Sequence, residues 1–530
     1  MRNIVNIVNF VRCVEPRRPM NLMEPVLKQV KLLRENNMKG TFLLQYDTIV
    51  DPEFQKLFIS LKDEFELGLW FEIVEPQVEA IGLKWRGRFP WDWYSDVGFL
   101  IGYEPEERRL LIDEAMRKFR EVFGYLPKSV GSWHMDAVSL KWLSDKYNVD
   151  AACICRDQVG TDGYTIQGGY YNQAYYPSKY NMLCPANSLE NQVNLPVFRM
   201  LGSDPVHAYD YQIIDYSSIG ISAVPTLEPA QSSYNTEYSD WLINEIFNGS
   251  GMCFQYTQVG QENSFGWEKM REGLSTQFRW LKKAAERGEV EIQTLAETGR
   301  MYKAKYKTTP PAVVSVLNEW KREGRKSVWF SGKYYRANLH WVNGKVYLRD
   351  IYMFRDTFGE EYLDKRCTTN ACGFRNLPVM DGSLFTGGAG AKMAGIYFAD
   401  ENGDIVFDLL EYSETETEAC VTLAKGDKKV KITFTETEMK LQSEISDLTL
   451  KAVYDKGKFL KNNESDVSTF TNSNNRTIVC PYPACTEKTE NSLKFSFCGF
   501  EYGIFAEAGR FDSNLNVIPD NGKIRICFDK

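Results

Sequence analysis

His134 is the residue whose type and setting most strongly suggest chemistry in this sequence. The chain holds only 3 His in 530 residues, and this one stands in SVGSWHMDAVSLKWL (129–143) beside Trp133 and Asp136. The residues before it have the pattern of a short strand, and those after it the pattern of a helix. Because imidazole titrates near neutral pH, His134 suits general acid–base catalysis. A neutral imidazole bound to a backbone carbonyl is the structural alternative.

Polar and charged residues also follow the other predicted strands of the N-terminal half. We expect Glu15 to be the partner acid of His134, or to stabilise the transition state, and Asp47 or Asp136 to orient the imidazole. Asp51 and Asp136 also stand where helix N-caps are expected. The candidate ligand-binding residues are Arg12, Tyr46, Glu72, Trp133, Arg156, Asp157, Arg199, Asp204 and Gln255, together with Asn343 from the C-terminal half.

The elements that would position these residues alternate between strands and helices over residues 1–308. Strands are predicted at 3–12, 41–46, 66–72, 128–133, 151–155, 196–200, 251–256 and 290–293, and helices at 22–36, 53–62, 105–123, 136–147, 237–248, 267–287 and 295–306. Seven or eight such pairs predict an α/β fold with a TIM-like (β/α)7–8 barrel, complete or distorted, whose strand ends converge on one face. An open doubly wound sheet is the alternative, but no GxGxxG or GxxxxGK[ST] motif supports it.

Residues 309–530 have a different pattern, with alternating polar and apolar positions that predict an antiparallel β-sandwich. The stretches VNGK and ENGD are hairpin signals, and Asn343 lies at the first of these turns. Only KTTPPA separates the halves after Tyr306, so we expect them to share an interface. The hairpin tip could reach the barrel rim of its own or of a neighbouring subunit, which would make a homodimer.

Composition excludes several classes of partner. The net charge is −8, the pI is about 5.4, and no basic block stands out, so no nucleic-acid partner is expected. No apolar run approaches about 20 residues, so no membrane span is expected. The chain would be cytoplasmic, or exported if a signal had been removed. The 12 Cys form no CxxC pair and few His accompany them, so neither a metal nor another cofactor is expected.

Carboxylates, amides and aromatic faces at strand ends together suit a sugar, whose rings stack while its hydroxyls form hydrogen bonds. The stretch KWRGRFPWDWYSD (84–96), with three Trp, two Arg and two Asp, would form one wall of a pocket or would be a packed loop. The layout resembles the polysaccharide-deacetylase and glycoside-hydrolase group of carbohydrate-active barrels. That group's metal-binding Asp-Asp and His-x-x-x-His motifs are replaced here by VEPRRP and FEIVEP.

The layout is also similar to the inverting sialidases of glycoside hydrolase family 156, which pair a rim His with a carboxylate near the first strand. His134 and Glu15 occupy comparable places, although that family's carboxylate is an Asp. The resemblance implies a metal-independent exo-glycosidase, with Arg12, Arg156 and Arg199 binding the carboxylate of a sialic acid. Two alternatives remain open: a carbohydrate esterase or deacetylase using Asp47, His134 and Asp204 with a metal, and a non-catalytic sugar-binding protein.

Overall fold

The structure is a computed structural model that describes residues 3–161, 163–171, 173–200, 204–212, 236–248, 251–388, 390–457, 467–471 and 476–530. Its N-terminal half is built on a sheet with the strand order β10-β1-β2-β3-β4-β5-β9-β8, and β11 also pairs with β1. The strands are β1 (Asn3–Val11), β2 (Thr41–Leu44), β3 (Glu66–Trp70), β4 (Ser129–Gly131), β5 (Ala151–Ile154), β8 (Ala174–Tyr175), β9 (Val197–Arg199), β10 (Tyr256–Val259) and β11 (Val290–Gln293).

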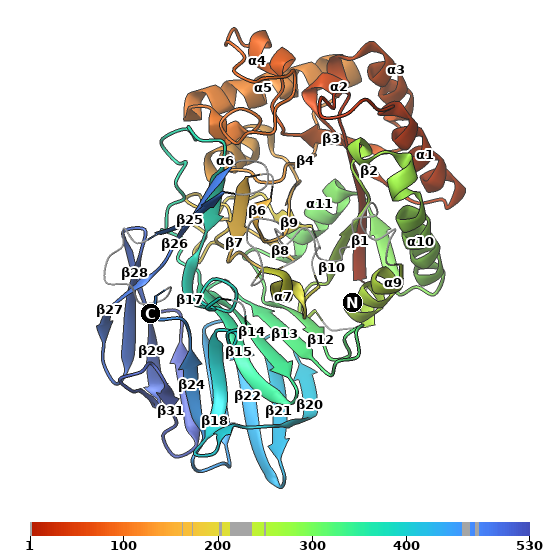
Figure 1. Cartoon of the computed structure of the whole chain (residues 1–530). Coiled ribbons are helices and arrows are strands. Elements are labelled where there is room, and N and C mark those ends of the chain that lie inside the picture. The colour runs from red at the N-terminus through yellow and green to blue at the C-terminus, as the bar shows by residue number, and fades with distance from the viewer. Residues whose placement is uncertain are drawn as a thin grey trace.

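This sheet is barrel-like and nearly closed. All its pairings are parallel except the one between β8 and β9, and within the described residues none joins β9 to β10. Most of the helices lie around the outside of this sheet, whereas α7 lies beside the strands of the C-terminal half (Figure 1). The helices are α1 (Met23–Glu35), α2 (Tyr46–Val50), α3 (Pro52–Leu61), α4 (Glu75–Ala80), α5 (Pro105–Phe123), α6 (Ala137–Tyr147), α7 (Ala208–Gln212), α9 (Thr236–Asn248), α10 (Trp267–Glu286) and α11 (Leu295–Lys305). None of these described helices combines the length and apolarity needed to cross a membrane.

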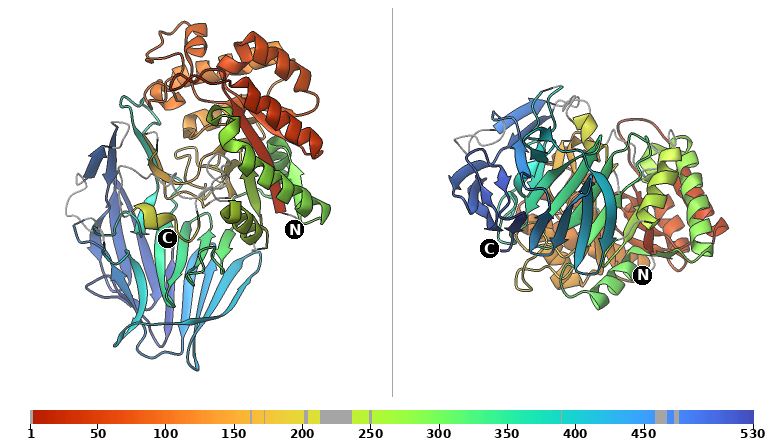
Figure 2. Two further views of the ribbon diagram at one scale, coloured as in Figure 1. Left: turned by 45° about the vertical axis from the view of Figure 1, so that its right-hand side comes forward. Right: turned by 90° about the horizontal axis from the view of Figure 1, so that it is seen from below.

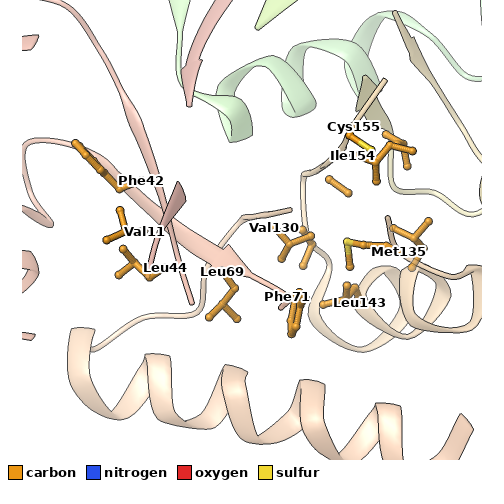
Figure 3. Packing of buried hydrophobic residues seen from close by; sticks show 14 of the residues in the cluster. Val11, Phe42, Leu44, Leu69, Phe71, Val130, Met135, Leu143, Ile154 and Cys155 are labelled. Atoms are coloured by element: carbon orange, nitrogen blue, oxygen red, sulfur yellow. The ribbon is translucent and has the colours of Figure 1, made fainter. Parts of the chain in front are cut away.

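Local sequence explains where the helices begin and end. The Asp51 carboxylate accepts hydrogen bonds from the backbone N–H groups of Glu53 and Phe54 at the start of α3, as the N-cap interpretation predicts. Helix α5 starts with a capping box between Glu104 and Glu107 and ends at Gly124, whose φ of +87° favours glycine. Behind the helices, Val11, Leu44, Leu69, Val130 and Ile154 of neighbouring strands form a buried apolar layer (Figure 3).

The C-terminal half contains two large antiparallel sheets that face each other across one hydrophobic core (Figure 2). The first has ten strands: β12 (Ala312–Val316), β13 (Lys326–Ser331), β14 (Tyr335–Val342), β15 (Lys345–Met353), β17 (Leu377–Asp381), β18 (Gly395–Asp400), β19 (Gly403–Asp404), β24 (Thr449–Val453), β30 (Arg510–Phe511) and β31 (Val517–Ile518). The second has eight: β20 (Asp408–Glu414), β21 (Glu418–Lys425), β22 (Lys428–Thr435), β23 (Glu438–Ser443), β27 (Ala484–Lys488), β28 (Ser492–Phe497), β29 (Phe500–Ala508) and β32 (Lys523–Cys527).

Both predicted hairpins are present in the first sheet. Asn343 and Gly344 turn the chain between β14 and β15 with φ values of +52° and +72°, as an Asn-Gly hairpin requires. The ENGD stretch forms the turn between β18 and β19. A smaller pair of strands, β25 (Val467–Thr471) and β26 (Thr477–Pro481), lies outside both sheets.

A third sheet links the two halves of the chain. Strands β6 (Gln158–Thr161) and β7 (Tyr164–Gln167) form a hairpin after β5, and β16 (Cys372–Arg375) pairs with β7 in parallel. The excursion from the barrel-like half is therefore completed by a strand from the C-terminal half. A chain division at residue 308 falls between α11 and β12 and stays a prediction.

Candidate functional site

A pocket of about 290 Å³ lies at the carboxyl ends of the parallel strands, on the face where barrel proteins keep their active sites. Its wall is aromatic and its charged residues come from the segments that follow β1, β3 and β10. The lining residues are Arg12, Arg17, Arg18, Glu72, Trp91, Trp93, Phe99, Trp133, Tyr164, Glu262, Ser264 and Phe265.

Arg12 holds two buried carboxylates of the pocket together. Its Nη2 lies 2.8 Å from Oε2 of Glu72 and 3.0 Å from Oε2 of Glu262. The indole N–H groups of Trp70 and Trp133 donate to Glu72 at 2.9 Å each, one to each carboxylate oxygen. The carboxylate of Glu72 is therefore fixed from three directions, whereas Arg12 is the one cation within ion-pair distance of Glu262 among the described residues.

Burial and charge act against each other at this site. Burial raises the pKa of Glu72, and the Arg12 charge and the two indole N–H groups only partly oppose it. Burial also raises the pKa of Glu262, where Arg12 opposes the shift and the negative charge of Glu72 adds to it. Glu262 therefore loses its proton less readily while Glu72 is ionised, and such unequal environments for paired acids are what acid–base chemistry requires.

Glu15 and two further arginines surround this group. Glu15 accepts hydrogen bonds from Nε and Nη2 of Arg17 at 2.7 and 2.6 Å, and its Oε2 lies 3.6 Å from Nη1 of Arg12. Burial would raise the pKa of Glu15, but the Arg17 hydrogen bonds and charge, with the Arg12 charge, outweigh it and lower this pKa. Arg18 donates to the carbonyl of Ser264 at 2.5 Å and has no carboxylate within ion-pair distance among the described residues.

The stretch 84–96 supplies one wall of the pocket through Trp91 and Trp93. The Arg12 guanidinium lies 4.0 Å from the centre of the Trp91 ring, and Arg17 contacts both indoles. Asp92 is 1% exposed and pairs with Arg88 at 2.7 Å, so the stretch is anchored by its own ion pair. The stretch is therefore both a wall of the pocket and a packed loop, the two interpretations that its sequence suggests.

His134 lies behind the pocket wall and is not one of the lining residues. It is 3% exposed, with Phe99, Tyr164 and Phe374 packed around its ring, and its Nε2 is 3.6 Å from Sγ of Cys372. Burial lowers the pKa of His134 to about 3, so the imidazole is neutral at physiological pH. Two of its neighbours, Phe99 and Tyr164, do line the pocket.

Asp136 and Asp47 hold backbone segments near the strand ends. Asp136 caps α6 through the N–H of Ser139 and pairs with Arg108 at 3.0 Å in a fully buried position. Asp47 accepts from the backbone N–H groups of Cys13 and Val14 and fixes the segment after β1. Burial raises its pKa. Neither residue lines the pocket.

Of the predicted ligand-binding residues, Arg12, Glu72 and Trp133 line the pocket, and the others lie elsewhere. Tyr46 donates to Glu114 of α5 at 2.7 Å. Arg199 pairs with Asp157 at 2.6 Å, and Asp157 also pairs with Arg336 of β14. These last three form a buried contact between the two halves of the chain.

The remaining predicted residues lie away from the pocket as well. Arg156 is buried two residues after β5. Asp204 accepts from the N–H groups of Val206 and His207 and from the indole of Trp320. Asn343 is exposed at its hairpin tip, where the turn contacts Phe407. The bounds predicted for the strand at 251–256 are wrong. Strand β10 begins at Tyr256, so Gln255 lies at the opposite end of the barrel from the pocket.

The pocket residues do not fit a divalent metal. Three arginines and no histidine line it, and its two carboxylates already share the guanidinium of Arg12. Asp47, His134 and Asp204 do not come together, and no group of three or more His, Cys, Asp or Glu in the described part of the chain has an arrangement that could hold a metal ion. Such ions prefer clustered carboxylate, imidazole or thiolate ligands.

Sequence reasoning missed several lining residues. Glu262, Arg17 and Arg18 were visible as charged residues after predicted strands, but their contacts with Arg12 and Ser264 depend on how distant segments meet. Tyr164 and Phe99 come from excursions that no periodic pattern marked. A correct end for β10 would have placed Glu262 three residues beyond the strand, among the candidates.

Comparison with known proteins supports the fold at low sequence identity. No family model matches the chain, and no curated protein matches it. A solved structure from Parabacteroides distasonis, provisionally assigned as a glycoside hydrolase/deacetylase, is similar with a TM-score of 0.51 and 16% identity over 71% of this chain and 89% of that one. At this identity the similarity establishes the fold alone.

Two polysaccharide deacetylases, both provisionally assigned, are more distant. The one from Mycobacterium smegmatis has a TM-score of 0.34 and 12% identity over 57% of this chain and 90% of its own. The one from Pseudomonas aeruginosa PAO1 has a TM-score of 0.36 and 11% identity over 57% and 91%. Fold and pocket together define this chain as a mixed α/β protein with a barrel-like sheet and a polar, aromatic-walled pocket at its strand ends.

Proposed function

We propose that the chain is a carbohydrate-active hydrolase that cleaves a terminal sugar from a glycan, with Glu72 and Glu262 as the reacting acids. The observation that carries this proposal is the meeting of two buried carboxylates on Arg12 inside an aromatic-walled pocket. Aromatic walls bind the apolar faces of sugar rings, and paired carboxyl groups hydrolyse glycosidic bonds. The similar structure from Parabacteroides distasonis, provisionally assigned to the same broad class, agrees with this choice.

The environments of the two acids suggest different roles. Glu262 has its pKa raised by burial and by the charge of Glu72, so it suits the proton donor to the leaving oxygen. Glu72, held by Arg12 and two indole N–H groups, suits the ionised partner that attacks or stabilises the anomeric carbon. No step in this scheme passes through a metal.

The spacing favours a retaining reaction. The Oε2 atoms of Glu72 and Glu262 lie 2.8 and 3.0 Å from the same nitrogen, so they are at most about 6 Å apart. Retaining glycosidases separate their carboxyl groups by about 5–5.5 Å, whereas inverting ones need about 6.5–9.5 Å to admit a water. The inverting scheme with His134 and Glu15 stays a prediction, and the position of His134 behind the wall gives it less support.

In its more specific form, the proposal is that the terminal sugar of the substrate is acidic. Arg18 lines the pocket without a carboxylate partner among the described residues, and Arg17 stands beside it. Such guanidinium groups suit the carboxylate of a uronic or sialic acid. The sialidase hypothesis therefore rests on Arg17 and Arg18 with Arg12, because Arg156 and Arg199 lie outside the pocket.

A turnover screen tests the proposal. Aryl glycosides of neutral sugars, a uronide, a sialoside and an acetylated sugar would be offered to the wild type, E72Q and E262Q in buffer with and without EDTA. Hydrolysis of a glycoside should fall about 10²–10⁴-fold in either variant and should survive EDTA. E114Q is the matched control, because Glu114 is also buried and paired with an arginine, Arg117, but lies on α5.

Other outcomes would redirect the function. Deacetylation without glycoside hydrolysis would favour the esterase, and tight sugar binding without turnover would favour a binding protein. Loss of activity in EDTA with restoration by a divalent ion would contradict the metal-independent scheme. Detection of the first-formed anomer by NMR would separate retention from inversion.

A further inference from the structure

A series of aromatic rings runs from the pocket to the surface along the stretch 84–96. Trp91 is 2% exposed beside Arg12, Trp93 is half-buried in the pocket wall, and Phe89 is 39% exposed. The Trp91 and Trp93 ring centres are 5.8 Å apart. Phe89 stacks on Trp93 at 5.9 Å with an angle of 8° between the rings. Three rings thus connect the buried acids to an exposed aromatic face.

Hydrogen bonds fix this series in place. The indole N–H of Trp85 donates to the carbonyl of Phe89 at 2.8 Å. Arg88 donates its backbone N–H and its guanidinium to the buried carboxylate of Asp92. The N–H of Glu75 at the start of α4 donates to the carbonyl of Pro90. The exposed ring is therefore held ready before any ligand arrives, which lowers the entropic cost of binding.

We propose that Phe89, supported by Trp93, is a second sugar subsite that binds the ring adjacent to the one in the pocket. A single exposed aromatic is ordinary on a protein surface, but this one is stacked in parallel on a residue that lines the pocket. An uncharged pyranose offers an apolar face that suits such a ring. The ligand class is thus an oligosaccharide of at least two residues, and this choice rests on the proposed function.

Because Phe89 lies on the surface side of the pocket wall, the two subsites would bind successive sugars of one chain. The pocket combines charge with aromatic walls and takes the terminal sugar, whereas Phe89 offers a stacking face beside Arg88, whose charge is already paired with Asp92. The outer subsite should therefore discriminate by chain length and not by charge. A monosaccharide with a small aryl leaving group would fill the pocket and make little use of Phe89.

Phe89→Ala tests the subsite with two substrates: the aryl monoglycoside that binds or reacts best in the turnover screen, and a trisaccharide that ends in the same sugar. Removal of the ring should raise the KM for the trisaccharide about 3–10-fold, which is the expected effect of losing one aromatic contact. The KM for the monoglycoside should change by less than about twofold. Y125A is the matched control, since Tyr125 is 38% exposed and contacts Phe119 away from the pocket.

Calorimetric binding of the same trisaccharide to wild type and F89A separates this proposal from the catalytic one. A Phe89-dependent loss of affinity supports the subsite even if wild type shows no turnover. Equal effects on both substrates, or no Phe89-dependent difference in binding or turnover of the trisaccharide, would overturn it even if E262Q proves the acid pair essential.

Discussion

At the scale of single residues, Arg12 is the group on which the pocket depends. It is 2% exposed and is the cation shared by Glu72 and Glu262. We predict that Arg12→Leu lowers the free energy of unfolding by about 3–5 kcal/mol, because it leaves two buried carboxylates without their partner. Urea denaturation at pH 7 measures this loss.

A surface pair provides the comparison for this prediction. Arg34 pairs with Glu64 at 2.7 Å, but both side chains are largely exposed. Arg34→Leu should therefore cost no more than about 1 kcal/mol. If Arg12→Leu were as mild as Arg34→Leu, the carboxylates would not need Arg12, and the electrostatic account of the pocket would be wrong.

His134 leads to a prediction about pH. Its pKa of about 3 lies below the ordinary value of 6.5 because the imidazole is buried. The unfolded chain gains a proton at His134 below about pH 6.5 and the folded chain does not, so stability is lost as the pH falls, by about 1.4 kcal/mol per unit. Between pH 7 and pH 5, the free energy of unfolding of His134→Leu should therefore fall by about 2 kcal/mol less than that of the wild type. Unfolding at both pH values checks this, and an unchanged slope would contradict the burial of a neutral ring.

The residue scale also shows what sequence could and could not predict. A scarce histidine at a strand end suggests catalysis, but which way its ring turns depends on Phe99 and on Phe374, which is 240 residues distant in the chain. Arg12, Glu72 and Trp133 are predictable from the sequence because they stand within two residues of the carboxyl ends of buried strands. Glu262 acquires its role only when β10 pairs with β1, and no local pattern records that pairing.

At the scale of elements, periodicity predicted the strands and helices that bury one face. Helix α5 and strand β11 have the predicted bounds. Helices α6, α10 and α11 differ from the prediction by one residue at one end, and α1 and α3 by one residue at each end. Short elements such as α2, α4 and β6 were missed because they contain too few residues to show a period. The aromatic run before β10 displaced that strand, since CFQY is as apolar as the strand itself.

The segment 354–371 between β15 and β16 is an element-scale clamp on the barrel-like half. Glu360 accepts from the backbone N–H groups of Ala137 in α6 and of Met182, both at 2.8 Å. Arg108 of α5 donates to the carbonyls of Tyr362 and Lys365 at 2.7 Å. The start of α6, where Asp136 pairs with Arg108 of α5, is thus closed by a carboxylate from the other half of the chain.

Glu360→Ala should destabilise the protein by about 2 kcal/mol at pH 5, because two buried N–H groups lose their acceptor. Burial and then the charge of Asp136 raise the pKa of Glu360 above 4.5, so its contribution is full below about pH 4.5 and declines as the pH rises. The effect of the substitution should therefore be smaller at pH 8. Glu361→Ala is the control, because Glu361 is exposed and pairs only with Lys365 among the described residues. Equal losses in both variants would contradict the clamp.

At the scale of the whole molecule, the two halves share buried charge and a common core. Arg336 of β14 pairs with Asp157 and donates to the carbonyl of Gly169 at 2.8 Å. Trp329 of β13 stacks on Tyr171 with ring centres 3.9 Å apart. Phe354, Tyr362, Cys367, Cys372 and Phe374 belong to the hydrophobic cluster of the barrel-like half. The short KTTPPA connection correctly predicted a shared interface, but its chemistry could not be predicted from the sequence.

This interface makes a strong prediction about fragments. Residues 1–308 expressed alone would lose Phe374 and Cys372 from around His134, and with them the support behind the pocket residues Phe99 and Tyr164. Asp157 would keep Arg199 but lose Arg336, and β7 would lose its neighbour β16.

We therefore expect the fragment to be insoluble, or soluble without ligand binding, since exposed apolar surface and unpaired strand edges promote aggregation. Co-expression with residues 309–530 should restore a soluble complex on size-exclusion chromatography, because these contacts can then form between the two fragments. A fragment that is soluble and as active as the full chain would show that the C-terminal half does not build the pocket wall.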